Sequence, residues 1–219
     1  PTNWDAWGAG EDEWVLEDYR SAVADYLRDR RVPDSHPIAT STDLPEAPLE
    51  GVEIAVDCGN GMGSLATPQV LGRLGADVVT INGSVDGHFP GRPSKPTPET
   101  LTDFIAYLGE SEADLGIAHD GDADRVVLLS ETGEVVHEDT VVAILGEYYV
   151  RASGADDPVV VTTPNASGRI DERVDAAGGR VERVRLGALH EGIDRVTADG
   201  GDVVFAAEPW KHIHPTLGH

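Results

Sequence analysis

Short runs of strand-forming residues alternate with helix-forming segments from residue 52 onward, and this alternation constrains the fold more than any other feature. The runs at 52–57, 77–82 and 115–120 are rich in valine, isoleucine and alanine. Segments of about ten residues or more with helix-forming composition lie between them. Strands that alternate with helices of this length predict a largely parallel sheet with helices on both faces. We therefore expect an α/β fold.

The same order of elements recurs after residue 158, which predicts a second unit similar to the first. "VEIAVDCGNGMGSLATPQVLGRLGADVVTI" and "PVVVTTPNASGRIDERVDAAGGRVERVRL" both contain a strand, a turn of small residues, a helix, a glycine and another strand. Such a repeat predicts two similar α/β/α domains with mixed, mainly parallel sheets. The expected organisation is an N-terminal helix and linker at 1–50, a first domain at 51–155 and a second at 156–219.

Acidic residues outnumber basic ones by 40 to 16, which gives the chain a formal net charge of -24. Because phosphate backbones and anionic membrane surfaces repel such a chain, we expect neither a nucleic-acid nor a membrane partner. The carboxylates are spread along the sequence, and the only lysines are Lys95 and Lys211. This composition is typical of a halophilic protein, in which concentrated salt screens the repulsion between carboxylates. We expect the fold to lose stability at low salt.

Cysteine usage and hydropathy favour a cytoplasmic location. Cys58 is the only cysteine, so an internal disulfide is ruled out. The sequence contains no long apolar run and no secretion or lipidation motif.

The stretch "GIAHDGDADRVVLL" places three aspartates within five positions between two strand-forming runs. Asp120, Asp122 and Asp124 alternate with small residues, so the chain can curl their carboxylates around one point. Unpaired carboxylates at that spacing would repel one another, and a hard divalent cation such as Mg²⁺, Ca²⁺ or Mn²⁺ relieves the repulsion. Arg125 follows directly, and its guanidinium matches the geometry of a phosphate group. The motif therefore indicates metal-assisted phosphate chemistry.

Two other interpretations of the aspartates remain open. An acidic turn that is merely solvated needs no metal. An EF-hand would place Asp120, Asp122 and Asp124 at loop positions one, three and five and Glu131 at position twelve, but Arg125 occupies the position that requires glycine. The flanks of the motif also favour strands, whereas an EF-hand has helices.

The glycine-rich stretch "DCGNGMGS" and the loop that contains Arg92 are weaker candidates for a phosphate site. Gly59, Gly61 and Gly63 follow a strand and precede a helix, but their spacing is not that of a dinucleotide-binding fingerprint. A tight structural turn is the favoured interpretation. Arg92 is a candidate phosphate ligand, and it could equally pair with a surface acid.

Several motifs together resemble one enzyme family. "DCGNGMGS", "DGHFPGRPSKPTPE" and "ADLGIAHDGDADRVVLL", within residues 52–151, resemble the second domain of the alpha-D-phosphohexomutases, the group of phosphoglucomutases, phosphomannomutases and phosphoglucosamine mutases. Residues 158–219 look like the start and middle of the third domain. The resemblance implies reversible, Mg²⁺-dependent transfer of phosphate between O1 and O6 of a hexose phosphate, through a phosphoserine and a hexose bisphosphate. It also implies that Asp120, Asp122 and Asp124 bind Mg²⁺ and that Arg125 is catalytic.

The resemblance is weaker in the sugar-recognition loop of the third domain. Glu208 aligns with the glutamate of the family's Gly-Glu-x-Ser-Gly loop, but Trp210 and Lys211 replace the serine and glycine. The resemblance implies substrate-binding roles for Glu208 and Arg185, and His190 and His212 are further candidates. The loop looks more like those of archaeal phosphoglucosamine mutases than like those of bacterial phosphomannomutases.

Two family motifs are absent from the sequence. Neither the Thr-Ala-Ser-His-Asn-Pro loop, which carries the nucleophilic serine, nor the Arg-x-Ser-Gly-Thr phosphate loop occurs. We expect the chain to be the middle part of a longer mutase. The alternative is a truncated, non-catalytic module that binds Mg²⁺ and a sugar phosphate, and a metal-dependent phosphatase that uses water is a third hypothesis.

Overall fold

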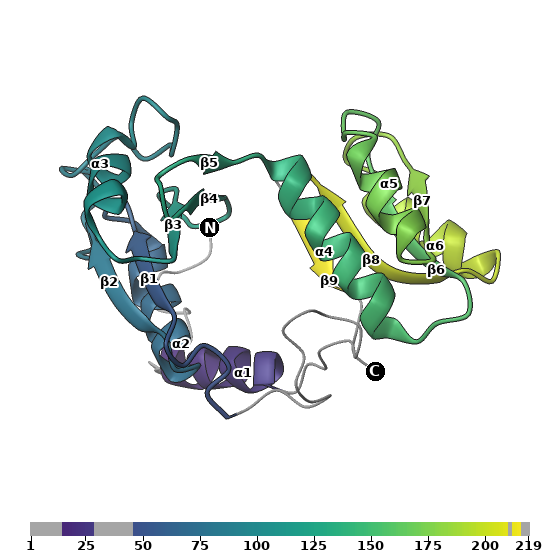
Figure 1. Cartoon of the computed structure of the whole chain (residues 1–219), viewed down its shortest axis with the longest axis horizontal. Coiled ribbons are helices and arrows are strands. Elements are labelled where there is room, and N and C mark those ends of the chain that lie inside the picture. The colour runs from purple at the N-terminus through teal and green to yellow at the C-terminus, as the bar shows by residue number, and fades with distance from the viewer. Residues whose placement is uncertain (1–14, 29–45, 210–211, 216–219) are drawn as a thin grey trace, which may run out of the picture.

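The computed structural model describes residues 15–28, 46–209 and 212–215. Within these residues the chain forms two units, each built around its own β-sheet (Figure 1). Among the described helices, none has the length and apolar character that a membrane span would require.

The first sheet is mixed and has the strand order β2-β1-β3-β4-β5. Strands β2, β1 and β3 run parallel, whereas β3, β4 and β5 are antiparallel neighbours. The strands are β1 (Glu53–Asp57), β2 (Asp77–Ile81), β3 (Leu115–His119), β4 (Val126–Ser130) and β5 (Val135–Val136).

Helices cover both faces of the first sheet. On one face, Phe104 and Leu108 of α3 (Thr102–Glu110) form a buried cluster with Ala55 and Leu129 of the sheet. On the other face, Ile54 and Val56 of β1 pack with Leu71 of α2. The remaining elements of this unit are the 3₁₀ helix η2 (Met62–Leu65), α2 (Thr67–Arg73) and α1 (Leu16–Arg28), of which α1 packs on α2.

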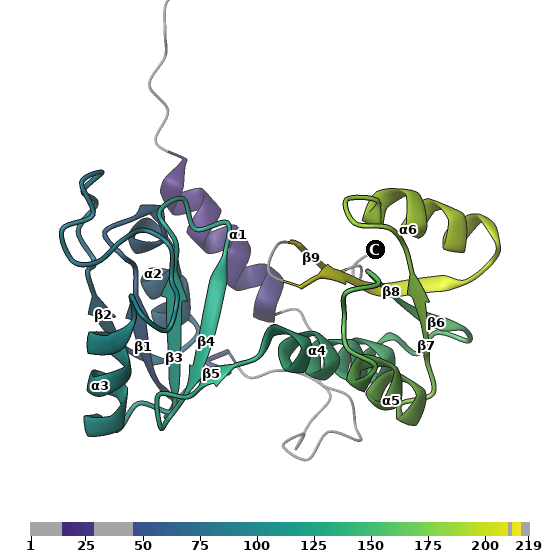
Figure 2. The same ribbon diagram turned by 90° about the horizontal axis from the view of Figure 1, so that it is seen from above.

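The second sheet has the order β7-β6-β8-β9, with β7, β6 and β8 parallel and β9 antiparallel at the edge. Helix α6 lies on one side of this sheet, and α4 and α5 lie on the other (Figure 2). Val160 and Phe205 face α4 and α5, whereas Val159 and Val161 face α6. The elements are α4 (Glu138–Ser153), β6 (Pro158–Thr162), α5 (Arg169–Ala176), β7 (Arg180–Arg183), α6 (Leu189–Ala198), β8 (Asp202–Glu208) and β9 (His212–Pro215).

These two layered sheets confirm the predicted α/β fold with mixed, mainly parallel sheets. The position of α4 bears on the predicted domain limits, because it precedes residue 155 but packs on the second sheet through Val142, Ala143 and Val150. Gly146 lets α4 approach the neighbouring helix α5 closely, since a Cβ there would lie 3.2 Å from a methyl carbon of Val174. We therefore propose a boundary near residue 137, at the start of α4, in place of 155.

The topology brings loops to one edge of each sheet. In open α/β sheets, binding sites form at the carboxyl ends of the parallel strands. The loop that contains the three aspartates follows β3, and Glu208 is the last residue of β8. The fold therefore puts both sequence candidates at the edges where a site is expected.

Candidate functional site

The loop between β3 and β4 gathers the three predicted carboxylates. Asp120, Asp122 and Asp124 each offer one oxygen atom, and these atoms lie within 4.8 Å of one another. Asp120 is buried, whereas Asp122 and Asp124 are exposed. One ligand is thus fixed in the protein and two face solvent.

Arg125 holds the buried aspartate in its charged form. Its Nε donates to Oδ2 of Asp120 at 2.7 Å and to Oδ1 of Asp124 at 3.3 Å, and its backbone N–H donates to Oδ1 of Asp120 at 3.1 Å. Burial of Asp120 opposes ionisation, but the hydrogen bonds from Arg125 outweigh it and lower the pKa of the carboxyl. The same contacts raise the pKa of Arg125. The loop therefore combines a carboxylate cluster with a fixed cation.

Backbone contacts with the glycine-rich turn set the shape of the loop. The N–H of Met62 donates to the carbonyl oxygen of Gly121 at 2.9 Å. A Cβ on Gly61 would lie 2.4 Å from that same oxygen, so only glycine permits the approach. Ala123 adopts a φ of 61°, the left-handed conformation that reverses the chain between Asp122 and Asp124.

A buried ion pair holds the strand ends that carry the aspartate loop. Arg92 donates from Nε to Oδ2 of Asp57 at 2.7 Å, and the side chains are 5% and 2% exposed. The guanidinium of Arg92 also donates to the carbonyl oxygen of His119 at 2.6 Å, so it connects the ends of β1 and β3. A Cβ on Gly59 would lie 2.8 Å from this guanidinium. Arg92 therefore pairs with a buried acid, whereas the alternative interpretation of the sequence named a surface acid. The glycine-rich stretch forms a tight turn against Arg92 and Gly121.

His119 connects the aspartate loop to the start of α2, a role that the sequence did not reveal. Its Nε2 lies 3.0 Å from Oγ1 of Thr67, and its Nδ1 lies 3.3 Å from the carbonyl oxygen of Arg125. Burial lowers the pKa of His119, which favours the neutral ring. A histidine that ends a strand gives no sequence signal for such contacts.

The donor set of the loop fits a hard divalent cation. Mg²⁺ and Ca²⁺ bind oxygen ligands at about 2.0–2.6 Å, so two ligands across one ion lie about 4–5 Å apart. The spread of 4.8 Å among the three aspartate oxygens agrees with this range. The loop joins two antiparallel strands, which excludes the helix-flanked EF-hand.

The second unit contributes Glu208 at the end of β8. This side chain is 4% exposed, and its Oε1 accepts the backbone N–H of Gly187. Gly187 has a φ of 76°, which turns the chain toward Glu208 after β7. A glutamate this deeply buried is unusual, because burying a charge is unfavourable unless the charge is paired or hydrogen-bonded.

Arg185 and His190, two other candidates of the second unit, are exposed, unlike Glu208. The guanidinium of Arg185 is 78% exposed and donates to Glu191 of α6 at 3.0 Å. His190 is exposed on α6. His212 begins β9, where its backbone pairs with Glu208, but its side chain lies outside the described part of the chain, as do Trp210 and Lys211.

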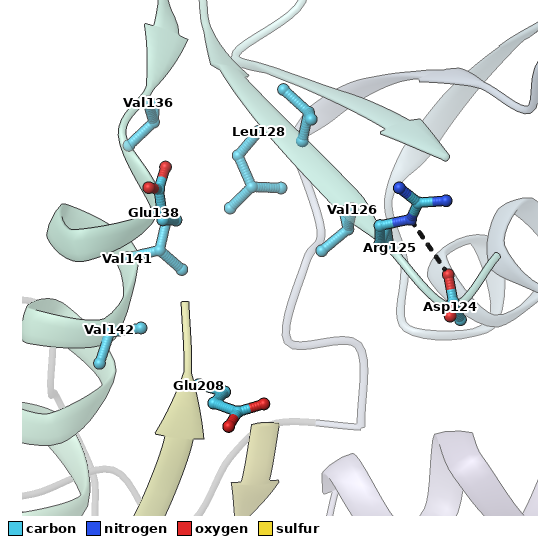
Figure 3. A pocket seen from close by; sticks show the side chains of 10 residues that line it. Asp124, Arg125, Val126, Leu128, Val136, Glu138, Val141, Val142 and Glu208 are labelled. Carbon is cyan, nitrogen blue, oxygen red and sulfur yellow. Dashed lines mark hydrogen bonds and ion pairs between the residues drawn. The ribbon is translucent and has the colours of Figure 1, made fainter. Parts of the chain in front are cut away.

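One cavity joins the two units beside the aspartate loop. It has a volume of about 200 Å³, and Asp124, Arg125 and Glu208 all line it (Figure 3). Glu138, at the start of α4, is a lining residue that the sequence analysis missed. Its position depends on how two separate sheets are juxtaposed, which local sequence patterns do not encode. The structure therefore brings the aspartate loop and Glu208 to a common space.

Comparison with known proteins gives consistent matches. Residues 36–133 match the family described as "Phosphoglucomutase/phosphomannomutase, alpha/beta/alpha domain II". A phosphopentomutase of Thermococcus kodakarensis is 41% identical over 208 residues, which are 93% of this chain and 40% of that protein. A phosphoglucosamine mutase of Methanococcus maripaludis is 36% identical over 174 residues, which are 74% of this chain and 37% of that protein.

Solved structures agree with the fold. A phosphoglucomutase/phosphomannomutase family protein from Burkholderia thailandensis superposes with a TM-score of 0.69 at 24% identity, over 94% of this chain and 40% of that one. The chain thus spans about 40% of the length of the relatives it matches. These matches identify residues 36–133 as the alpha/beta/alpha domain II of the phosphoglucomutase/phosphomannomutase family and show that the chain is similar to proteins of that family.

Proposed function

We propose that the chain is part of a phosphohexomutase that transfers phosphate reversibly between O1 and O6 of a hexose phosphate. The observation that carries the proposal is the cavity that Asp124 and Arg125 of the aspartate loop share with Glu208. A metal site, a cation suited to phosphate and a buried carboxylate suited to sugar hydroxyls then face the same space. Phosphoryl transfer relies on this combination of positioning and charge stabilisation.

Each group has a defined part in this scheme. Asp120, Asp122 and Asp124 would hold Mg²⁺, the ion on which the family depends, and a bound Mg²⁺ neutralises charge on the phosphoryl oxygens during transfer. Arg125 orients Asp120 and Asp124 through its Nε, and its remaining N–H groups are available to phosphoryl oxygens. Glu208 accepts hydrogen bonds from sugar hydroxyls, and Arg185 and His212 are further substrate ligands in the proposal.

The proposal includes partners that lie outside the described site. The family's phosphoserine motif does not occur in the sequence, so the serine must come from elsewhere in the complete enzyme. Hexose phosphate and hexose bisphosphate are the small-molecule partners. A cytoplasmic location also belongs to the proposal, and the absence of a second cysteine supports it.

A pentose phosphate is the second candidate substrate. The match that covers 93% of the chain is to a protein named phosphopentomutase. The aspartate loop would serve hexose and pentose phosphates alike, so the three aspartates do not distinguish the two substrates. The distinction must come from the residues around Glu208.

The test is a ³¹P NMR assay on the protein isolated from its source organism, with hexose 1-phosphate, a trace of hexose 1,6-bisphosphate and Mg²⁺. We expect interconversion of the 1- and 6-phosphates. A chromosomal Asp122→Asn substitution should abolish it without unfolding the protein, because the amide cannot replace a carboxylate ligand. Asp156→Asn is the matched control, since Asp156 is an exposed loop aspartate of the second unit.

Two outcomes would contradict the mutase proposal. Release of inorganic phosphate without isomerisation would identify a phosphatase. Binding of sugar phosphate with neither reaction would identify the non-catalytic module. An active Asp122→Asn enzyme would refute the role of the aspartate loop.

A further inference from the structure

Phe89 has a backbone conformation that is unfavourable for a bulky side chain. Its φ is 52°, in the left-handed region that glycine and asparagine adopt far more readily than phenylalanine. The other described non-glycine residues with positive φ are Asn60, Asn82 and Ala123, so Phe89 is the only bulky one in the part of the chain that the structure describes. Strain of this kind persists where surrounding contacts impose it, and it is common at ligand-binding sites.

Asn60 of the glycine-rich turn holds the loop that carries Phe89. Its Oδ1 accepts the N–H of Gly91 at 3.0 Å, and its Nδ2 donates to the carbonyl oxygen of Ser84 at 2.9 Å. Its backbone carbonyl oxygen accepts the N–H of Asp86 at 2.9 Å. The N–H of Phe89 in turn donates to the carbonyl oxygen of Asp86 at 2.9 Å. Because Asn60 is 5% exposed, these bonds are largely shielded from water, and they fix the position of Phe89.

The ring of Phe89 lies against the aspartate loop at Gly121. A Cβ on Gly121 would lie 2.9 Å from Cζ of Phe89 and 3.0 Å from Cε1, so the absence of a side chain lets the ring lie this close. The glycine-rich turn holds the same residue, because the carbonyl oxygen of Gly121 accepts the N–H of Met62 at 2.9 Å. Gly121 lies between Asp120 and Asp122 in the chain, so the position of its backbone sets the directions of these two carboxylates.

We propose that Phe89 is a positioning residue for the aspartate loop. Its ring fixes the backbone at Gly121, and this keeps Asp120 and Asp122 directed at one metal ion. The three aspartates repel one another when no cation is bound, so an unsupported loop would open. A loop that is held in the binding arrangement loses less freedom when the ion binds, so its affinity is higher. This inference rests on the proposed function, since it takes the aspartate loop as a Mg²⁺ site.

The test separates the effect of the ring from that of the strain. Phe89→Ala and Phe89→Asn both remove the ring, but asparagine tolerates the left-handed conformation better than alanine does. Mg²⁺ is titrated calorimetrically into each variant of the 219-residue chain in concentrated KCl, and urea unfolding measures its stability. We expect both variants to bind Mg²⁺ about tenfold more weakly than the wild type, the scale of lost contacts around metal ligands. Phe89→Asn should nevertheless unfold at a higher urea concentration than Phe89→Ala.

Val85→Asn is the matched control, because Val85 is 51% exposed in the same loop, and it should bind Mg²⁺ as the wild type does. A purely structural role of Phe89 predicts a different pattern, in which Mg²⁺ affinity follows stability and Phe89→Asn binds more tightly than Phe89→Ala. That pattern, or wild-type affinity in either variant, overturns the inference and leaves the proposed function intact. If the wild type binds no Mg²⁺, the proposed function loses its metal site and the inference fails with it.

Discussion

The site-bearing ends of the two sheets are built in different ways. At the first sheet, the Asp57–Arg92 pair is 2% and 5% exposed and links two strand ends below the aspartate loop. At the second sheet, the Arg185–Glu191 pair is 78% and 70% exposed and lies on the surface. The first end is fixed by buried charge and close backbone contacts, whereas ion pairs at the second end remain in contact with water.

This difference matches the demands that the proposed function makes on the two ends. A metal and a transferred phosphoryl group need ligands held in nearly constant positions, which buried pairs and glycine contacts supply. Substrate selection can vary between related enzymes without disturbing the chemistry. The loop around Glu208 departs from the family pattern at Trp210 and Lys211, while the aspartate motif is intact. Under the proposed function, the rigid end holds the metal and the phosphoryl group, and the open end selects the substrate.

The largest expected difference is between Arg92→Ala and Arg185→Ala. Removing Arg92 leaves the carboxylate of Asp57 buried without its cation, so the free energy of unfolding should fall by about 3–5 kcal/mol. Removing Arg185 breaks an exposed pair and should change it by about 0–1 kcal/mol. Urea unfolding in concentrated KCl measures the free energy of unfolding of both variants. Equal losses of this free energy would contradict the distinction between the two ends.

Gly61→Ala should weaken the metal site through the backbone. The new methyl group would lie 2.4 Å from the oxygen of Gly121, so the aspartate loop must shift, and we expect Mg²⁺ affinity to fall by about 10- to 100-fold. Gly72→Ala is the matched control, since a Cβ there meets nothing within 4 Å. Alanine in α2 should raise stability by about 0.5–1 kcal/mol. Calorimetric titration measures the Mg²⁺ affinity of both variants. A Gly61→Ala variant with the same Mg²⁺ affinity as the wild type would contradict the account.

Cys58 provides a smaller, pH-dependent test of how well the site-bearing end of the first sheet is buried. Burial, helped by the nearby Asp57, raises the pKa of its thiol to about 11 from a reference of 9.0. Because the folded pKa is raised, the thiol's contribution to stability is complete below pH 9 and is lost as the pH rises toward 11. The stability difference between wild type and Cys58→Ala should shrink over this range. A thiol that reacts rapidly with a disulfide reagent at pH 8 would show that this end opens.

The sequence predicted local elements well because their signals are local. The strands around residues 53–57 and 115–119 and the aspartate loop follow from short hydrophobic runs and motif spacing. The packing of α4 and the position of Glu138 were not predictable, since both depend on surfaces that meet only after two sheets form. The partner of Arg92 stayed open for the same reason, because Asp57 lies 35 positions away along the chain.

The most direct test of the account is calorimetric titration of Mg²⁺ into the 219-residue chain in concentrated KCl, with wild type and Asp122→Asn compared. The account predicts one binding site in the wild type. Because loss of the hydrogen bonds that orient metal ligands already reduces metal affinity by about 10- to 100-fold, loss of a carboxylate ligand should reduce it at least as much. Equal Mg²⁺ binding by both proteins, or none by the wild type, would contradict the claim that the aspartate loop is a metal site.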